Sequence, residues 1–449
     1  MTIPLTSHSE PAFSPASEPR STPETMRVLF GVTGGIAAYK VCEALSALAQ
    51  LGGQPLASRT LESRLESQLE SLTESRIEVR AIVTEGAQQF ITPLTIATLC
   101  RHPVYTDRDF WQADRDRPLH IELGEWADVI VIAPLTANTL AKLAYGLADN
   151  LLTNTVLAST CPILLAPAMN TDMWEQATVQ RNWRTVNGLE RYHTIDPGSG
   201  LLACDRRGAG RMAEPRHLVS QIRSLLYSHG DRDLAGRTIL ISAGGTREAI
   251  DPVRFIGNPS TGKMGVALAQ AAAHRGATVT LVCAPTMLDL DLPGIHVVRV
   301  VSADEMRSEL HDQFATTDWL LMAAAVADVR PAQCHLTKLA KADLPANLPL
   351  MDVPDLVAEL ASRKQASQRI IGFAAQTGDI VTPALGKLRR KGLDAIVANP
   401  VDRLGAGFGS ETNEAVFIDA AGQQTVLPSA SKLLLAHRLL DQVQALKQH

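Results

Sequence analysis

The sequence is poor in aromatic residues and has neither a strong net charge nor a long apolar run. Aromatic residues make up 4% of the 449 residues, while hydrophobic residues make up 45%, which fits an Ala-, Val- and Leu-rich α/β protein. The longest apolar runs fall well short of the roughly 20 residues that span a membrane. The net charge of −5 argues against a general nucleic-acid binder, which is usually basic. We therefore expect neither nucleic acid nor membrane as a partner.

Cysteine is also sparse and is not arranged in pairs. The six cysteines, at positions 42, 100, 161, 204, 283 and 334, form no Cys-x-x-Cys motif. Their scatter argues against a zinc site and against a disulfide framework. A reducing cytoplasm is the simplest location for this chain.

The chain is long enough for two or three domains. Residues 1–25 are rich in Pro, Ser and Thr and lack the apolar stretch of a signal peptide, which predicts a disordered leader. We place the first domain at 26–222. A Leu-Glu-Ser repeat at about 55–76 interrupts it and is typical of an insertion at a surface loop. A polar stretch then predicts a linker at 223–235, before a second domain at 236–449.

Two glycine-rich strand–turn–helix openings are the most informative local pattern. The first occupies residues 27–40 and contains Thr33-Gly-Gly, and the second begins at 238 and contains Gly244-Gly-Thr. Each apolar run stops at small residues and continues as a helix, so backbone N–H groups can face a phosphate. The sequence therefore predicts two sites for phosphate-bearing ligands.

Strands and helices alternate in both halves of the chain. The apolar patterns predict helices at 36–50 and 263–274 and strands at 27–33, 77–84, 129–133, 163–166, 238–242, 278–282, 319–325, 370–374 and 393–398. This alternation is typical of α/β domains with a doubly wound parallel sheet, whose ligands lie at the carboxyl ends of the strands.

Three polar residues of the first half are candidates for chemistry. His120 could exchange protons near neutral pH, although a surface histidine is the commoner case. Asn170 follows a strand and could bind a carboxylate or simply occupy a turn. Cys204 lies in a segment rich in Gly and Arg, which predicts a mobile flap whose thiol could give or take a proton. The alternative is an inert cysteine, which is the commoner case for a lone cysteine in a loop.

The motifs of residues 26–222 resemble a known family when taken in order. Gly-x-Thr-Gly-Gly-Ile-Ala-Ala-Tyr-Lys, His-Ile-Glu-Leu, Ala-Pro-x-Thr-Ala-Asn-Thr, Pro-Ala-Met-Asn and an Ala-Cys…Gly-Arg-Met flap are similar to those of flavin-dependent cysteine decarboxylases, phosphopantothenoylcysteine decarboxylases above all. The resemblance implies a flavodoxin-like domain with bound FMN. It also implies that His120 acts in substrate oxidation, that Asn170 holds the substrate carboxylate and that Cys204 supplies a proton. The implied FMN-binding residues are Gly34, Gly35, Thr84, Thr136, Asn138 and Thr139.

The second half offers candidate anion-binding residues. The segment 258–265 ends in Gly-Lys-Met-Gly, and Met264 breaks the Gly-Lys-Ser/Thr pattern of a nucleoside triphosphatase. Arg254 and Asn258 could face one ligand or form an ordinary ion pair and turn. Lys387 and Lys391 lie one helical turn apart, as on a solvated face or against a triphosphate.

Residues 236–445 resemble phosphopantothenate–cysteine ligases of the bacterial type. The resemblance rests on Gly-Gly-Thr-Arg-Glu-x-x-Asp-Pro-Val-Arg-Phe-Ile-x-Asn, followed by Ala-Ala-Val-Ala-Asp, Pro-Asp-Leu and Gly-Phe-Ala-Ala. It implies CTP with Mg²⁺, whose ligands stay unassigned, and an acyl-cytidylate held by Asn258 and Arg254, with Lys338 stabilising charge. The implied CTP-binding residues are Ala325, Asp328, Lys338, Met351, Asp352, Val353, Pro354, Phe373, Lys387 and Lys391.

Three departures from the ligase pattern fall near the expected nucleotide. Ala340 stands where the family has a lysine, Gln376 stands where it has a glutamate, and Asp352 replaces the common Lys or Asn. These changes bear on nucleotide affinity and leave Asn258 and Lys338 in place.

The sequence thus predicts a bifunctional enzyme of coenzyme A synthesis with two doubly wound, Rossmann-like domains. Its expected partners are phosphopantothenate, cysteine and CTP, together with further copies of the chain, as decarboxylase trimers joined by ligase dimers. A nicotinamide oxidoreductase would need Gly-x-Gly-x-x-Gly, which neither opening contains. A flavin-binding regulatory protein without catalysis would lack His120 or Cys204, and both are present.

Overall fold

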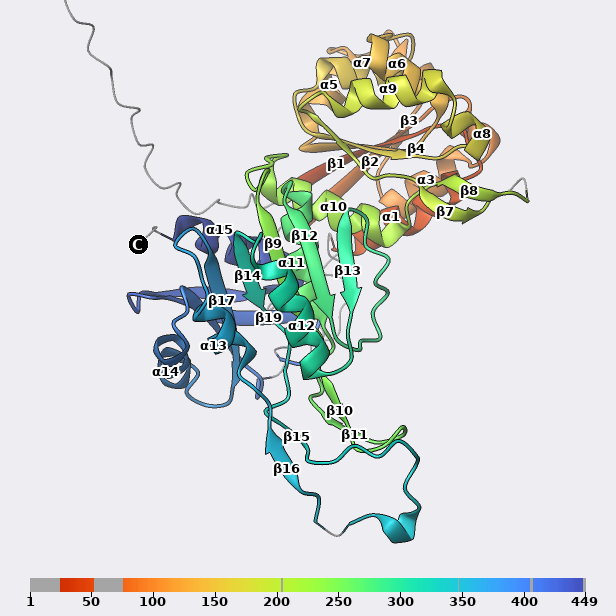
Figure 1. Cartoon of the computed structure of the whole chain (residues 1–449). Coiled ribbons are helices and arrows are strands. Elements are labelled where there is room, and N and C mark those ends of the chain that lie inside the picture. The colour runs from red at the N-terminus through yellow and green to blue at the C-terminus, as the bar shows by residue number, and fades with distance from the viewer. Residues whose placement is uncertain (1–24, 52–75, 203–204, 346, 404–406, 447–449) are drawn as a thin grey trace, which may run out of the picture.

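The computed structural model describes residues 25–51, 76–202, 205–345, 347–403 and 407–446. The predicted leader, nearly all of the Leu-Glu-Ser insertion and Cys204 lie outside these described residues. The described chain forms two α/β domains, each built around its own sheet (Figure 1).

The first sheet has six parallel strands in the order β3-β2-β1-β4-β5-β6. This is the Rossmann order, in which the direction of winding reverses between β1 and β4. The four predicted strands are confirmed, whereas the short edge strands β3 and β6 were not predicted. The bounds are β1 Thr25–Val32, β2 Arg76–Val83, β3 Val104–Tyr105, β4 Val129–Leu135, β5 Ile163–Pro167 and β6 Tyr192–Thr194.

Helices cover both faces of this sheet, so its central strands are buried on both sides. One face packs against α1, Ala38–Leu51, α3, Pro93–Cys100, and α10, Pro215–Ser228. The other face packs against α5 Leu119–Trp126, α6 Ala137–Tyr145, α7 Leu151–Ala158 and α9 Ala177–Asn187. Three short helices lie in the connections: η2 Ala87–Gln89, α4 Asp107–Phe110 and α8 Thr171–Trp174.

The second sheet has eight strands in the order β13-β12-β9-β14-β17-β18-β19-β20. The pairs from β13 to β18 are parallel, and β19 and β20 extend the sheet as an antiparallel hairpin. The strands are β9 Thr238–Ala243, β12 Thr278–Cys283, β13 Ile295–Arg299, β14 Trp319–Met322, β17 Arg369–Gln376, β18 Ala395–Pro400, β19 Thr412–Asp419 and β20 Gln424–Ser431. The strand predicted over 319–325 ends at Met322, because the next residues form a loop at the sheet edge.

This sheet is also covered on both faces. The face that holds Ile239 and Leu321 packs against α11, Lys263–His274, and α15, Lys432–Ala445. The opposite face packs against α12 Ala303–Phe314, α13 Leu356–Ala361 and α14 Val381–Lys391. The doubly wound architecture that the sequence predicts is therefore confirmed in both domains.

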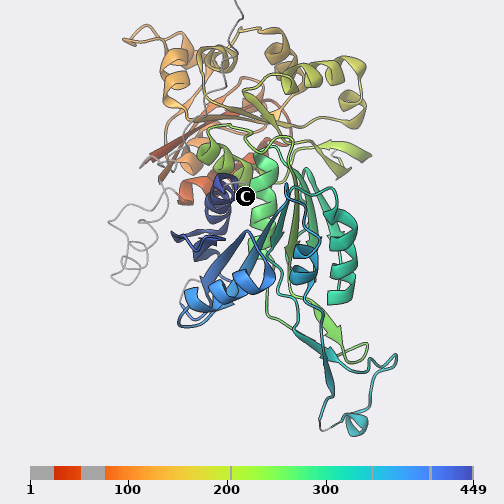
Figure 2. The same cartoon turned by 60° about the vertical axis from the view of Figure 1, so that its left-hand side comes forward.

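A narrow lobe projects from the second domain on the side away from the first domain (Figures 1 and 2). It contains two small antiparallel pairs and is tied together by His335, whose backbone N–H donates to the carbonyl oxygen of Ile250 at 2.9 Å. Its elements are β10 Arg247–Ala249, β11 Phe255–Gly257, β15 Val329–Pro331, η3 Lys341–Asp343 and β16 Leu350–Asp352.

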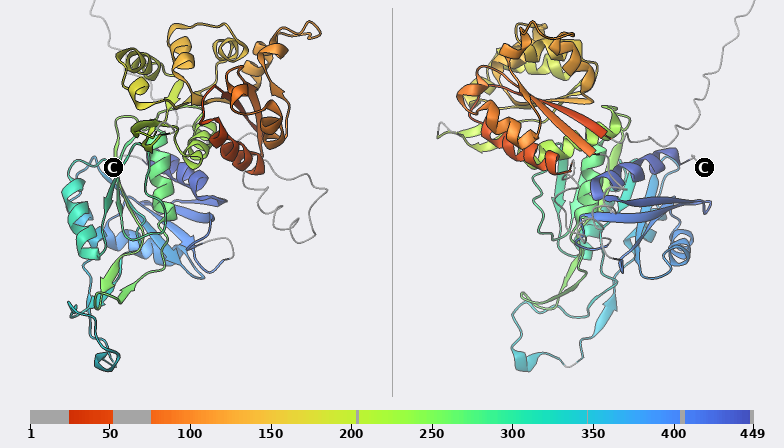
Figure 3. Two further views of the ribbon diagram at one scale, coloured as in Figure 1. Left: turned by 90° about the vertical axis from the view of Figure 1, so that its right-hand side faces the viewer. Right: turned by 180° about the vertical axis from the view of Figure 1, so that it is seen from behind.

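Helix α10 joins the two domains and lies between them (Figure 3). It continues through Ser228, which falls inside the stretch predicted as a linker. Ser224 Oγ lies 2.7 Å from His274 Nδ1 on α11 and 2.9 Å from His437 Nε2 on α15. Tyr227 donates its hydroxyl proton to Asp441 on α15 at 2.5 Å. A single helix of the first domain is thus hydrogen-bonded to two helices of the second.

Candidate functional sites

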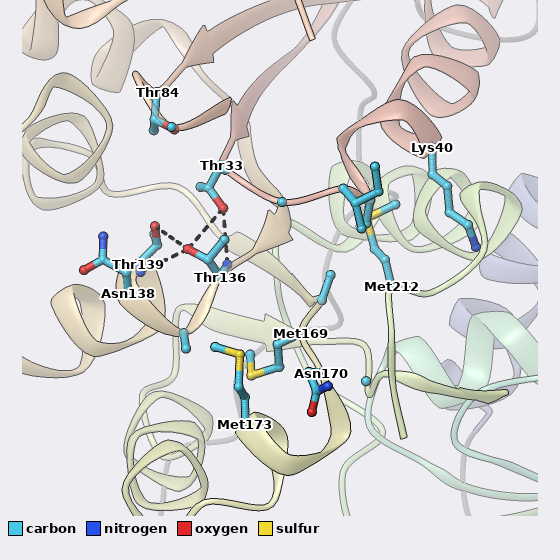
Figure 4. Close-up of a pocket in the computed structure, with 18 of the residues that line it drawn as sticks. Thr33, Lys40, Thr84, Thr136, Asn138, Thr139, Met169, Asn170, Met173 and Met212 are labelled. Carbon is cyan, nitrogen blue, oxygen red and sulfur yellow. Dashed lines mark hydrogen bonds between the residues drawn. The ribbon is translucent and has the colours of Figure 1, made fainter. Parts of the chain in front are cut away.

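A cavity of about 970 Å³ opens at the carboxyl ends of the first sheet, where β1 and β4 diverge. All six predicted FMN-binding residues line it, and Asn170 lies on its wall (Figure 4). The six are Gly34, Gly35, Thr84, Thr136, Asn138 and Thr139. The switch point of a doubly wound sheet is where ligands bind, so topology and local sequence agree on this site.

The glycine turn after β1 lets two loops touch at this cavity. A Cβ added to Gly34 would lie 2.7 Å from the carbonyl carbon of Gly86 in the loop after β2. Any larger residue at position 34 would therefore separate the loops. The sequence needs glycine here so that the backbone can form a close cradle.

Hydroxyl groups connect the loops that follow β1 and β4. Thr33 Oγ1 donates to the carbonyl oxygen of Pro134 at 2.5 Å and accepts from the backbone N–H of Thr136 at 3.2 Å. Thr136 Oγ1 accepts from the backbone N–H of Thr139 at 3.3 Å, so this side chain caps the N-terminus of helix α6 (Figure 4). This network places several hydroxyl and amide groups in fixed positions around the cavity.

Cationic groups lie at the edge of the same cavity. Lys40 Nζ donates to Glu214 at 2.9 Å, and Arg211 Nη2 lies 3.5 Å from the same carboxylate. The hydrogen bond from Lys40 is the main reason that the pKa of Glu214 lies below its usual value. Lys142, paired with Asp149 at 2.8 Å, lies on another wall. These ion pairs place cationic groups within reach of a ligand, although Glu85, Asp107 and Asp149 also line the cavity.

A β-hairpin flap borders the cavity. Its strands are β7, Gly198–Leu201, and β8, Arg207–Arg211. The flap is held against the end of β5, because Met169 N–H donates to Gly210 O at 2.9 Å and Thr171 Oγ1 donates to Ala209 O at 2.8 Å. Cys204 falls between β7 and β8 in the sequence and lies outside the described residues, so its role at the cavity stays a prediction.

His120 is not among the residues that line the first cavity. It lies on α5, where its ring packs edge-on against Phe110 with 5.4 Å between ring centres. Its Nδ1 atom is buried and has no hydrogen-bond partner among the described residues. A single chain therefore does not bring His120 together with Asn170, whose side chain caps α8 by accepting from Asp172 N–H at 2.7 Å.

The second cavity, of about 600 Å³, lies at the carboxyl ends of β14, β17 and β18. Asn258 lies at its edge and donates from Nδ2 to the carbonyl oxygens of Ala325 and Val326, each at 3.3 Å. Lys391 is paired with Asp355 at 3.0 Å. The predicted residues that line this cavity are Asn258, Ala325, Asp328, Val353, Pro354, Phe373, Lys387 and Lys391.

Four predicted ligase residues lie in the projecting lobe and do not line this cavity. Arg254 is held there by Asp251 at 2.7 Å and by the carbonyl oxygen of Leu339 at 3.3 Å. Lys338 precedes Leu339 and is exposed, and Met351 and Asp352 belong to β16. The structure thus brings Arg254 close to the Lys338 segment but separates both from Lys387 and Lys391.

The sequence reasoning missed Lys432 and left Lys263 without a role, although both residues line the second cavity. Lys432 is the first residue of α15 and is 7% exposed. Burial, with a smaller contribution from Lys263, lowers its pKa to about 8. An isolated lysine after a serine carries no recognisable motif, so only the folded chain reveals its position.

Neither a metal cluster nor a membrane-spanning helix is found in the part of the chain that the structure describes. No group of three or more His, Cys, Asp or Glu side chains there is arranged to hold a metal ion. No helix there is long and apolar enough to cross a membrane.

Comparison with known proteins identifies the family. A flavoprotein family model matches residues 63–227, and the model of the DNA/pantothenate metabolism flavoprotein C-terminal domain matches residues 234–446. Coenzyme A biosynthesis bifunctional protein CoaBC of Bacillus subtilis is 40% identical over 419 residues, which cover 93% of this chain and 97% of that protein. The chain belongs to this family. It is a bifunctional flavoprotein enzyme of coenzyme A biosynthesis, with the decarboxylase and ligase roles that the sequence predicts.

Two further similarities cover parts of the chain. A cysteine/cysteine sulfinic acid decarboxylase from an unknown prokaryotic organism is 44% identical over 332 residues, which cover 73% of this chain and 92% of that protein. The crystal structure of the C-terminal domain of a coenzyme A biosynthesis bifunctional protein CoaBC is 35% identical, with a TM-score of 0.41. It covers 48% of this chain and 97% of that structure.

Proposed function

We propose that this chain catalyses two consecutive steps of coenzyme A synthesis. In the second domain, the carboxylate of 4'-phosphopantothenate attacks CTP to form an acyl-cytidylate with release of pyrophosphate, and the amine of cysteine then displaces CMP. In the first domain, phosphopantothenoylcysteine is decarboxylated to 4'-phosphopantetheine with FMN. The observation that carries this proposal is the presence of two separate cavities, one at the carboxyl ends of each sheet, lined by residues of the two matching motif sets.

The residues of the first cavity fit FMN. Backbone N–H groups at Gly34 and Gly35 would hold its phosphate, and the hydroxyls of Thr84 and Thr136 would orient its polar groups. Met169, Met173 and Met212 also line the cavity and offer adaptable apolar contacts for a flat ring system (Figure 4). When bound, FMN supplies the reversible two-electron oxidation that makes loss of CO₂ easy.

The chain's own residues would bind the substrate and move protons. Asn170 would hold the substrate carboxylate, and Cys204 would return a proton after CO₂ has left. His120 would act in oxidation of the cysteinyl thiol, but it lies outside the cavity of its own chain. We infer that His120 serves the cavity of a neighbouring copy, in a trimer of decarboxylase domains. Its orphaned, buried Nδ1 supports a role that one chain does not fulfil.

The second cavity would hold CTP. Lys387 and Lys391 would bind the triphosphate, with Mg²⁺ on the phosphate oxygens, and Phe373 with the 323–328 loop would enclose the nucleoside. Asn258 would bind the acyl-cytidylate at the edge of the cavity. Arg254 and Lys338 lie in the lobe of the same chain, away from this cavity. We infer that two ligase domains pair, so that the lobe of one copy completes the site of the other.

One experiment tests the whole proposal. Purified protein is incubated with phosphopantothenate, cysteine and CTP, and the product masses are followed together with the visible spectrum. We expect a yellow protein that forms CMP, phosphopantothenoylcysteine and then phosphopantetheine. A protein without a flavin spectrum, or one that leaves all three substrates unchanged, would contradict the proposal.

A further inference from the structure

The second cavity has a second cationic side, away from Lys387 and Lys391. We call it the α15 side and define it by Lys263, Phe408, Asn413 and Lys432, all of which line the cavity. Lys263 begins α11 and Lys432 begins α15, and these helices cover the face of the sheet opposite to α14. Two lysines at each end of one cavity suggest two bound anionic groups.

Lys432 is held in place by the loop that leads into β19. Its Nζ donates to the carbonyl oxygen of Ser410 at 2.5 Å and to that of Gly407 at 3.3 Å. An ammonium group has three protons, so these two bonds leave one for another acceptor. Because the residue is 7% exposed, a ligand in the cavity is a better-placed acceptor than bulk water.

The local charge balance favours an anion at this place. Lys263 is paired with Glu411, a residue whose side chain is 84% exposed, and also donates to the carbonyl oxygen of Gly409 at 2.8 Å. Both hydrogen bonds of Lys432 go to uncharged carbonyl groups, so within the described residues no carboxylate is bonded to it. Glu411 offsets part of the charge of Lys432, but the same carboxylate is already paired with Lys263, so two lysines share one acidic group. A bound anion would offset the remaining cost of burying these cations.

Phosphopantothenate has the matching chemistry, since it carries a phosphate monoester at one end and the reacting carboxylate at the other. The triphosphate of CTP is assigned to the α14 lysines, so the phosphate monoester needs a separate cationic group. We propose that Lys432, together with Lys263, binds the phosphate monoester of phosphopantothenate on the α15 side of the cavity. This inference rests on the proposed ligase function and specifies how its substrate is oriented.

The test compares ligands with and without the phosphate. Lys432→Met keeps an unbranched side chain of similar length but removes the charge. By calorimetry, we expect the Kd of phosphopantothenate to rise roughly tenfold or more, as for loss of a charged hydrogen bond, while the Kd of pantothenate stays unchanged. In the steady-state ligase assay, the KM of phosphopantothenate should rise similarly while the KM of CTP changes by less than about twofold.

Two further variants control for folding and for charge in general. Lys432→Arg retains the positive charge and should recover part of the phosphopantothenate affinity. Lys364→Met removes a lysine that pairs with Asp394 outside the cavity and should leave both affinities unchanged. Equal weakening of phosphopantothenate and pantothenate, or a rise in the KM of CTP alone, would overturn the assignment. An inactive wild-type protein would instead contradict the proposed ligase function itself.

Discussion

At the scale of single residues, Gly210 shows how closely the flap approaches the first cavity. Its φ of 135° is one that other residues rarely adopt, and an added Cβ would lie 2.2 Å from the carbonyl oxygen of Met169. Gly210→Ala would therefore push the flap away from Asn170. We expect a loss of more than about 1 kcal/mol in unfolding free energy and a weaker Kd for FMN, measured by denaturation and by flavin fluorescence. Gly146→Ala is the control, because its φ of 68° is also positive but nothing lies within 4 Å of the added Cβ. If both variants bind FMN equally well, the flap does not depend on this contact.

The position of each site residue relative to the strands decides whether the sequence could predict it. Gly34, Thr136 and Asn170 were identifiable because each lies in the first few residues after a strand of a parallel sheet, and such strand ends meet at one edge. His120 and Arg254 have recognisable motifs, but their positions depend on α5 and on the lobe, and neither lines the cavity expected for it. Lys432 was missed because a lone lysine at a helix start has no local pattern, and its burial results from tertiary packing alone.

At the scale of elements, the contact of α10 with α11 and α15 should make stability depend on pH. Burial, and to a smaller extent His217, lowers the pKa of His274 to about 3, against 6.5 when unfolded. The unfolded chain therefore binds more protons between these values, and stability falls as the pH drops below about 6.5. We expect this group to contribute at most about 1.4 kcal/mol per pH unit, measured by urea denaturation at pH 7, 6 and 5. His274→Gln keeps a polar partner for Ser224 and should flatten the dependence. Identical pH profiles for wild type and variant would exclude His274 as the source.

The elements also differ in how readily the sequence reveals them. The helix predicted at 263–274 has those same bounds, because Gly262 and Gly276 flank an alanine-rich apolar pattern. The parallel strands were found because each is a buried apolar run. The β19–β20 hairpin and the short pairs of the lobe were not predicted. The hairpin strands alternate between more and less buried residues instead of forming a continuous buried apolar run. The lobe strands are only three residues long, and their pairing depends on segments outside each strand.

At the scale of the whole molecule, the first domain reaches the ligase cavity through α10. Arg223 on α10 donates from Nη2 to Ser431 Oγ at 2.5 Å. Ser431 caps α15 and immediately precedes Lys432, so Arg223 is placed to position that lysine across the domain interface. We expect Arg223→Ala to raise the KM of phosphopantothenate several-fold in the ligase assay, while kcat and the decarboxylation of added phosphopantothenoylcysteine stay close to those of wild type. Arg223→Lys should restore part of the affinity.

A matched control separates this positioning role from loosening of the domain contact in general. Arg216 also lies on α10 and pairs with Asp289 of the second domain at 2.5 Å, but neither residue lines the ligase cavity. Arg216→Ala should therefore leave the KM of phosphopantothenate unchanged. An equal rise in KM for both variants would mean that α10 acts only by holding the domains together. A rise confined to Arg223→Ala would mean that joining the two domains in one chain helps to organise the ligase site, because a side chain of one domain then fixes the cap of a helix in the other.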